Sequence, residues 1–283
     1  MAAPLPFTCM LCHGRGCKTI HQKQPWKYLR CIGCGLVQLY PPPEAEKAID
    51  AYEDYLDDHS GEIADWQRMM QPVVTRSADL IESRRGGRKG GILDIGCGYG
   101  FFLNEMRLRG WQTQGVEISP AGRKYAQNQF GLRVTHQPAE AIEWPDARFD
   151  VITLFYVIEH LLDPPAMLHR VHRWLKPDGL LLLRWPHSTP IVRFLGPLAA
   201  KLDLYHTPFH IYDFSPRTMQ HMLRQCGFAP IETVIGGYTR PAHRAARWCS
   251  ILTGRLGEFI QRRSKGRLLL PGLSKTTLAR KRA

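Results

Sequence analysis

The chain has 283 residues, a formal net charge of +13, and 44% hydrophobic residues. This length suits one globular core with a small additional module, and the apolar content excludes an intrinsically disordered chain. No run approaches the roughly 18 consecutive apolar residues of a membrane-spanning helix, and residues 1–7 are too short and too uncharged for a signal peptide. We therefore expect a cytoplasmic protein.

Four cysteines near the N-terminus form two Cys-x-x-Cys pairs, Cys9 with Cys12 and Cys31 with Cys34. Eighteen residues separate the pairs, which is the spacing of a zinc ribbon. The alternative, a pair of disulfides, is disfavoured in the cytoplasm. Such a short segment buries too little surface to fold alone, so a metal would supply about 10 kcal/mol of its stability. We predict that residues 1–40 are a ribbon whose four thiolates hold one structural Zn²⁺.

Residues 41–89 are predicted to form a helical linker or cap. Prolines 41–43 break the chain, and helical spacing of apolar residues then covers residues 45–56 and 65–84, with an interruption at Pro72. Two interpretations stay open for these helices. They cover a substrate site, or they are scaffold that packs against the core.

A buried strand that runs directly into a glycine-rich turn follows at residues 92–100. Asp94 lies near the strand end, and Gly96, Gly98 and Gly100 provide a bend without Cβ atoms, so a ligand can approach the backbone closely. The spacing is Gly-x-Gly-x-Gly rather than the Gly-x-Gly-x-x-Gly of dinucleotide sites. A cofactor with a compact polar end therefore fits better than a dinucleotide.

A helix from Phe101 to Arg109 and a second strand ending at Glu117 come next. Glu117 should lie beside Asp94, where a carboxylate can accept hydrogen bonds from both hydroxyls of a ribose. Further strands are predicted, with helices between them, at residues 132–135, 149–154, 180–184 and 229–235. Residues 90–238 are thus expected to form an α/β domain with a doubly wound, Rossmann-like sheet.

These motifs resemble the class I S-adenosylmethionine-dependent methyltransferases. Asp94 and the glycine turn match the first motif of that family, and the resemblance continues through residues 149–152, 156–164 and 175–180. It covers roughly residues 90–235 and is nearest to the ubiquinone-type O-methyltransferases and their relatives in glycan and lipid pathways.

The resemblance implies a set of S-adenosylmethionine-binding residues. The glycine turn would hold the methionine end of the cofactor and Glu117 its ribose. Ile118 would lie against one face of the adenine, with Ala139 and Glu140 along its edge. Phe155, at the end of the fourth strand, is placed in the same cofactor-binding set.

Transfer of a methyl group to a hydroxyl calls for a base, which a positioned histidine can provide. We favour His160, beside Glu159, and then His187, both just beyond the ends of predicted strands. A structural role is the alternative for each. His206 and His210 are expected to shape the acceptor pocket instead.

Residues 239–283 are predicted to form a basic amphipathic tail. From Arg240 onward there are twelve Arg or Lys and one acid, Glu258, so this segment carries +11. An apolar stripe from Trp248 to Ile260 runs beside the arginines, a pattern typical of a helix on an anionic membrane surface. The alternative is a helix docked on its own core or on a second subunit. Membrane contact would favour a peripheral location on the inner face and a lipid-linked acceptor.

The sequence thus predicts a methyltransferase for a small-molecule, glycan or lipid-linked acceptor, modified at a hydroxyl oxygen. One alternative is an RNA methyltransferase that uses the ribbon and the basic tail. Against it, residues 154–157 read Leu-Phe-Tyr-Val, whereas amino-group methylases of nucleic acids have an Asn or Asp followed by two prolines and an aromatic residue. A second alternative is a non-catalytic nucleic-acid-binding adaptor. The acceptor, the methylated atom and the oligomeric state stay open.

Overall fold

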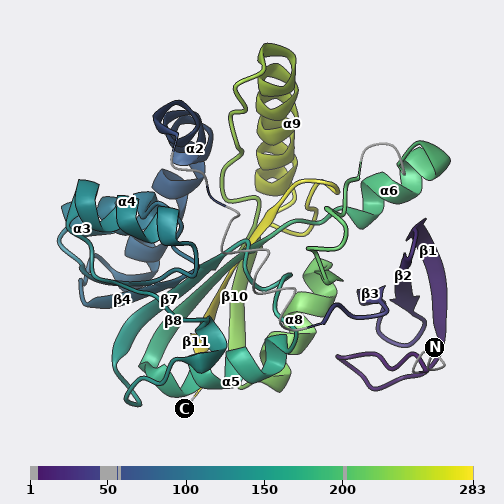
Figure 1. Cartoon of the computed structure of the whole chain (residues 1–283), viewed down its shortest axis with the longest axis horizontal. Coiled ribbons are helices and arrows are strands. Elements are labelled where there is room, and N and C mark those ends of the chain that lie inside the picture. Colours follow the sequence, from purple (N-terminus) through teal and green to yellow (C-terminus); the bar gives the residue numbers. More distant parts are fainter. Residues whose placement is uncertain (1–5, 45–55, 57–58, 200–202, 283) are drawn as a thin grey trace.

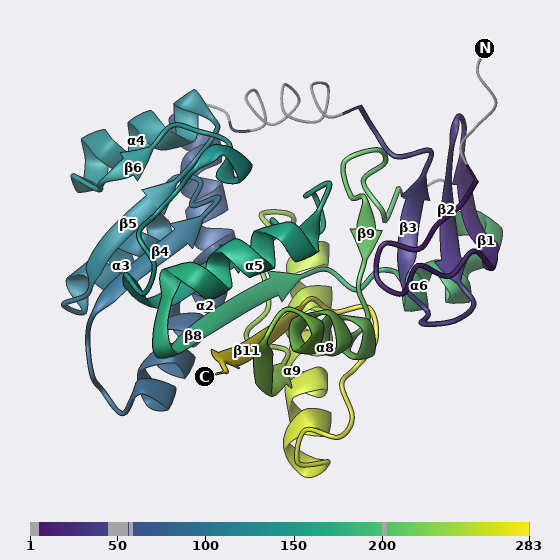
Figure 2. The ribbon, with the colours of Figure 1, turned by 90° about the horizontal axis from the view of Figure 1, so that it is seen from below.

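The computed structural model describes residues 6–44, 56, 59–199 and 203–282. Its strands form two sheets, a seven-stranded sheet in the order β10-β11-β8-β7-β4-β5-β6 and a four-stranded sheet in the order β1-β2-β3-β9. The two sheets lie at different ends of the molecule, as Figures 1 and 2 show. The helix expected over residues 45–56 lies outside the described residues except for Leu56.

The large sheet confirms the predicted α/β fold. Strands β4 to β8 run parallel, and β11 is antiparallel to both of its neighbours. The strands are β4 (Gly91–Ile95), β5 (Gln112–Val116), β6 (Val134–Thr135), β7 (Phe149–Phe155), β8 (Leu175–Trp185), β10 (Phe228–Val234) and β11 (Lys275–Lys281).

Successive side chains along each strand point to opposite faces of the sheet and so contribute to two hydrophobic layers. On β8, Leu181 and Leu183 pack with helices α5 and α8, whereas Leu180 and Leu182 pack with α2 and α3 on the other face. The helices of the domain are α2 (Ser60–Arg85), α3 (Phe101–Leu108), α4 (Pro120–Phe130), α5 (Pro164–Trp174), α6 (Thr189–Leu195), α8 (Pro216–Gln225) and α9 (Arg244–Arg263), with short 3-10 turns η1 (Ala139–Ala141) and η2 (Gly196–Leu198).

Helix α2 is continuous, so the predicted interruption at Pro72 was wrong. Pro72 lacks the N–H that would bond the carbonyl of Arg68, and the carbonyl of the next residue, Met69, accepts a hydrogen bond of 3.0 Å from the backbone N–H of Arg240. Val73, the residue after Pro72, is fully buried against the sheet. Tertiary packing therefore compensates for the local break.

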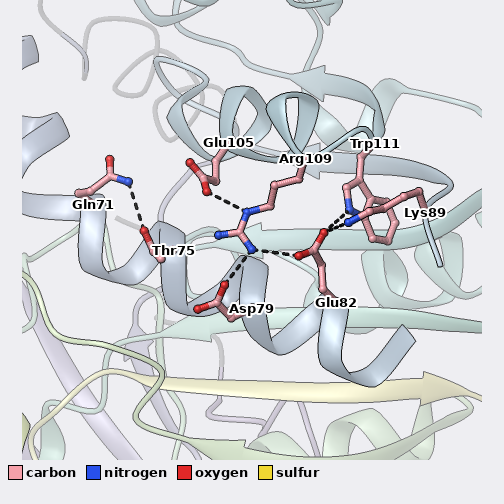
Figure 3. Close-up of polar contacts among 8 residues, drawn as sticks. All are labelled: Gln71, Thr75, Asp79, Glu82, Lys89, Glu105, Arg109 and Trp111. Carbon is pink, nitrogen blue, oxygen red and sulfur yellow. Dashed lines mark hydrogen bonds and ion pairs between the residues drawn. The ribbon is translucent and has the colours of Figure 1, made fainter. Parts of the chain in front are cut away.

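A charged network fixes α2 against α3 (Figure 3). Arg109 donates to Asp79 on α2 at 2.8 Å, to Glu82 on α2 at 3.0 Å, and to Glu105 on α3 at 2.8 Å. The indole N–H of Trp111 donates to Glu82 at 3.2 Å. Because α3 begins at the glycine turn after β4, this network helps to set the position of that turn.

The small sheet joins the N-terminal segment to the α/β domain. Three strands come from the predicted ribbon, β1 (Cys17–Lys23), β2 (Trp26–Cys31) and β3 (Val37–Tyr40). The fourth strand, β9 (Tyr212–Asp213), comes from a segment much later in the sequence. The ring of Tyr28 also stacks on Tyr205 at a centroid distance of 4.0 Å. The N-terminal module is therefore anchored to the larger domain by a shared sheet and an aromatic contact.

The C-terminal segment is not one amphipathic tail, which corrects the expectation for residues 239–283. Residues 275–281 form β11, which lies between β8 and β10 inside the large sheet. Its centre, residues 276–279, is buried, and the Thr277 hydroxyl lies 2.8 Å from that of Thr233 on β10. Only α9 matches the predicted amphipathic helix, and it projects from the body in both views (Figures 1 and 2). None of the described helices is long and apolar enough to cross a bilayer.

Candidate functional site

The turn between β4 and α3 has the conformation that its glycines allow. Gly96, Gly98 and Gly100 have φ values of 72°, 54° and 80°, in the left-handed region that favours glycine. A Cβ at Gly96 would lie 2.5 Å from Val157, and one at Gly100 would lie 2.6 Å from Leu132. At Gly98 the nearest atom to such a Cβ is 3.7 Å away. The turn is closely packed at both ends and has only an ordinary van der Waals contact, with Leu56, in the middle.

Glu117 follows β5 and faces this turn. One carboxylate oxygen accepts a hydrogen bond from the Gly98 N–H at 2.6 Å, and the other accepts from the Ser119 N–H at 2.8 Å. Burial raises the pKa of Glu117, and these backbone donors oppose that shift. A carboxylate offers about four acceptor positions, so two remain for a ligand. The geometry fits the cis hydroxyl pair of a ribose.

Asp94 lies under the same turn, in β4. Its side chain is 2% exposed, and it accepts a hydrogen bond of 2.7 Å from the Thr153 hydroxyl on β7. Burial raises the pKa of Asp94 to about 8, and the nearby Glu117 carboxylate acts in the same direction. The structure thus brings together the two acids and the glycines that the sequence assigned to the cofactor.

The other predicted cofactor residues lie around this pair of acids. The carbonyl of half-buried Ile118 lies 2.9 Å from Nε2 of His136. Glu140 is exposed in the short turn η1, which also contains Ala139. Phe155, at the end of β7, packs on Phe102 with ring centroids 4.7 Å apart. Among the described residues no hydrogen bond, ion pair or ring contact joins these positions to one another, so their assignment stays a prediction.

Glu159 and His160 lie in a buried polar cluster together with His210. The carboxylate of Glu159 is buried, and its oxygens have no hydrogen-bond partner among the described residues. Burial raises the pKa of Glu159 to about 8 and lowers that of His160 to about 4. Nδ1 of His160 lies 2.9 Å from the Phe209 carbonyl oxygen. The donor atoms of the three cluster residues lie within 4.8 Å of one another, close enough for a metal ion.

His187 lies elsewhere, in the wall of a cavity of about 460 Å³. The cavity is bounded by the N-terminal module, by α6 and by the start of α8. Nδ1 of His187 is buried and has no hydrogen-bond partner in the described part of the chain. Burial lowers the pKa of His187 to about 4, so its ring is neutral at physiological pH. Of the two histidines favoured from sequence, only His187 lines this cavity.

The four predicted metal ligands come together at one point of the N-terminal module. Sγ of Cys9 lies 3.5 Å from Sγ of Cys34, and Sγ of Cys12 lies 3.5 Å from Sγ of Cys31. A tetrahedral Zn²⁺ with Zn–S bonds of about 2.3 Å requires sulfur atoms about 3.8 Å apart. The donor set and its spacing fit such an ion.

Sequence reasoning missed two features of the site region. Arg184 on β8 is 1% exposed, and its guanidinium donates to Tyr156 at 2.8 Å and to the carbonyls of Ile235, Gly236 and Gly237 at 2.9 to 3.1 Å. It thereby connects the end of β7 to the loop after β10. The second feature is the set of arginines around the cavity, which come from segments far apart in the sequence. Neither feature has a local motif that could have revealed it.

The chain matches a family model described as a methyltransferase domain over residues 66–233, more than half of its length. It is similar to the ubiquinone biosynthesis O-methyltransferase of Ruegeria pomeroyi, 31% identical over 151 residues, which are 50% of this chain and 60% of that relative. The corresponding enzyme of Azotobacter vinelandii is 31% identical over 138 residues, 46% of this chain and 58% of the relative. The matched region therefore spans about three fifths of these relatives.

Solved structures show the same fold at low identity. The 1,6-didemethyltoxoflavin-N1-methyltransferase of Burkholderia thailandensis, with bound 1,6-didemethyltoxoflavin and S-adenosylhomocysteine, aligns with a TM-score of 0.55 and 18% identity over 93% of this chain and 98% of its own. A methyltransferase of Thermotoga maritima, described as a possible histamine N-methyltransferase, aligns with a TM-score of 0.55 and 16% identity over 82% of this chain and 99% of its own.

Proposed function

Because the chain belongs to the class I S-adenosylmethionine-dependent methyltransferases, we propose that it transfers a methyl group to a hydroxyl oxygen of a small-molecule, glycan or lipid-linked acceptor. The observation that carries the proposal is the arrangement of Glu117, Gly98 and Asp94 at the ends of adjacent strands. The similarity to O-methyltransferases of ubiquinone biosynthesis supports oxygen as the methylated atom.

In this proposal the residues of the chain position the reactants. The backbone at Gly98 and the remaining acceptor positions of Glu117 hold the cofactor, and Asp94, bonded to Thr153 on the neighbouring strand, lies next to the turn. S-adenosylmethionine supplies an activated methyl group when bound. Correct orientation of the acceptor against it can contribute about 7–11 kcal/mol to lowering the barrier.

We assign the proton of the acceptor hydroxyl to Nδ1 of His187. His187 lines the cavity, its buried Nδ1 has no partner among the described residues, and the low pKa of His187 keeps a ring lone pair available at neutral pH. The same low pKa limits its strength as a base, so we expect the lower end of the usual contribution, about 100-fold. Nδ1 of His160 lies against the Phe209 carbonyl, which favours a positioning role for His160 and Glu159.

We also propose that Cys9, Cys12, Cys31 and Cys34 bind one structural Zn²⁺. By joining the two Cys-x-x-Cys turns, the ion would hold β1, β2 and β3 in place. Because β3 pairs with β9, the ion would also stabilise the segment that follows α6. The metal would then act on the acceptor side of the molecule without taking part in the reaction.

Finally, we propose that α9 contacts an anionic membrane surface from the cytoplasmic side. Its outer face carries Trp248, Leu252, Leu256 and Phe259, each between 51% and 64% exposed. Its inner face is occupied by glycines, which allow close contact with Tyr238 and Ile235. The apolar stripe is therefore not the surface that docks α9 on its own core, and exposed arginines lie beside it on the same helix.

A labelling screen tests the reaction. Purified protein is incubated with S-adenosylmethionine that carries a deuterated methyl group, together with separate lipid, glycan and RNA extracts, and the products are analysed by mass spectrometry. We expect label on an oxygen of a lipid or glycan component, and no label with the Glu117→Ala protein. Label confined to RNA would refute the acceptor class, and absence of S-adenosylmethionine binding would refute the reaction.

A further inference from the structure

The cavity beside His187 has a strongly positive rim. Three arginines line it, Arg30 from β2, Arg193 from α6 and Arg217 from the first turn of α8. No ion pair joins any of these arginines to a carboxylate in the part of the chain that the structure describes. Unpaired guanidinium groups that converge on one cavity from three elements are suited to an anionic ligand.

The single carboxylate among the described lining residues does not cancel this charge. Asp213 is 4% exposed, and its two oxygens accept hydrogen bonds from the N–H groups of Ser188 at 2.8 Å and Thr189 at 3.0 Å. Its charge is thus used to fix the backbone between β8 and α6. Among the Asp, Glu, Arg and Lys side chains that line the cavity, three guanidinium groups thus stand against one engaged carboxylate, and Cys34 of the cysteine cluster also contributes to the lining.

The cavity lining also includes an uncharged polar group. The neutral ring of His187 lines the cavity, and its buried Nδ1 has no partner among the described residues. A volume of about 460 Å³ lies within the usual range of small-molecule sites. The cavity therefore has room for a ligand that carries both an anionic group and a hydroxyl.

We propose that this cavity binds the phosphate or diphosphate ester group of the acceptor, held by Arg30, Arg193 and Arg217, with the acceptor hydroxyl directed toward His187. Planar guanidinium groups can each donate two parallel hydrogen bonds to phosphate oxygens. The inference rests on the proposed methyl transfer, because it names the class of acceptor for that reaction. It also gives the N-terminal module a role, since Arg30 comes from that module.

Binding of inorganic pyrophosphate tests the site directly. Isothermal titration calorimetry of the full chain with S-adenosylhomocysteine present should show saturable binding of pyrophosphate. Arg193→Gln and Arg217→Gln should each weaken it by about tenfold or more, because each removes a hydrogen bond between two charged groups. Both positions lie outside the cysteine cluster, so the zinc content should stay unchanged. Arg224→Gln, on the same helix as Arg217, and Arg76→Gln, on α2, remove comparable exposed charges away from the cavity and should leave the affinity unchanged.

Two further titrations identify the source of the phosphate. Binding of uridine diphosphate with the same dependence on Arg193 and Arg217 indicates a soluble nucleotide-linked acceptor. Binding to neutral vesicles that contain a polyprenyl phosphate, with the same dependence, indicates a lipid-linked acceptor. Either result supports the proposal. It is overturned if none of the three probes binds, or if the two cavity variants weaken binding no more than the two controls do.

The same calorimeter separates this inference from the proposed function. Normal binding of S-adenosylhomocysteine without binding of any phosphate probe would remove the acceptor class and leave methyl transfer standing. Failure to bind S-adenosylhomocysteine would remove methyl transfer itself, whatever the phosphate probes show.

Discussion

Replacing Glu117 by alanine should weaken binding of S-adenosylmethionine by about 10-fold to 100-fold. The structure leaves two acceptor positions of this carboxylate for the ribose hydroxyls, beside the two that Gly98 and Ser119 occupy. A hydrogen bond to a charged group contributes about 1.5–3 kcal/mol, and the loss of even one such bond gives this range. The variant should also lose stability, by about 1–3 kcal/mol, because two backbone N–H groups lose their acceptor.

The two effects can be measured separately. Calorimetric titration with S-adenosylmethionine gives the affinity, and urea denaturation of the apo protein gives the free energy of unfolding. Glu117→Gln keeps the volume of the side chain and should still weaken binding, since a neutral amide is a poorer acceptor. Glu232→Ala, an acid on β10 that pairs with Arg84, is the control and should leave the affinity unaltered. If the Glu117 variants bind the cofactor as tightly as the parent protein, the ribose assignment is wrong.

Three further predictions concern the metal, the membrane and pH. Metal analysis should find one zinc per chain, and Cys31→Ser should lose most of it because the tetrahedral set loses a thiolate; a variant that keeps its zinc would refute the site. Leu252→Glu should reduce sedimentation with anionic vesicles several-fold, since it places a negative charge in the exposed stripe of α9, and unchanged sedimentation would exclude that surface. Burial raises the pKa of Asp94 from 3.8 in the unfolded chain to about 8 in the folded protein. The folded state therefore holds a proton that the unfolded state lacks between these values, so this contribution to stability is lost as pH rises from about 4 to about 8. Urea denaturation of Asp94→Asn should show a flatter pH profile over that window, and an identical slope would contradict the burial argument.

The sequence was sufficient for the features that depend on neighbours along the chain. Gly96, Gly98 and Gly100 could be recognised because a left-handed turn after a buried strand requires glycine in any surroundings. The two Cys-x-x-Cys pairs could be recognised for a similar reason, since each knuckle is a local turn that brings two thiolates to one point. Runs of apolar residues located the parallel strands within a few residues of their observed bounds.

Pairings between distant segments were decided only by the tertiary structure. Residues 275–281 are rich in Lys and Arg and were predicted to be part of a tail. They form β11 because the backbone N–H and C=O groups along the facing edges of β8 and β10 need hydrogen-bond partners, which this strand provides. The basic ends of this strand reach acceptors that no local pattern reveals. Lys275 donates to the carbonyls of Leu270 and Leu273, and Lys281 donates to that of Leu175.

The same division applies to the site. The sequence by itself determined the glycine turn, the acid near the end of each of two strands and the metal-type cysteines, because each is a short motif with its own stereochemistry. Only the folded chain could place Arg30, Arg193 and Arg217 around one cavity, or separate His187 from His160. A cavity is formed by whichever segments the sheet order brings together, and that order follows from long-range packing and backbone pairing rather than from residue spacing.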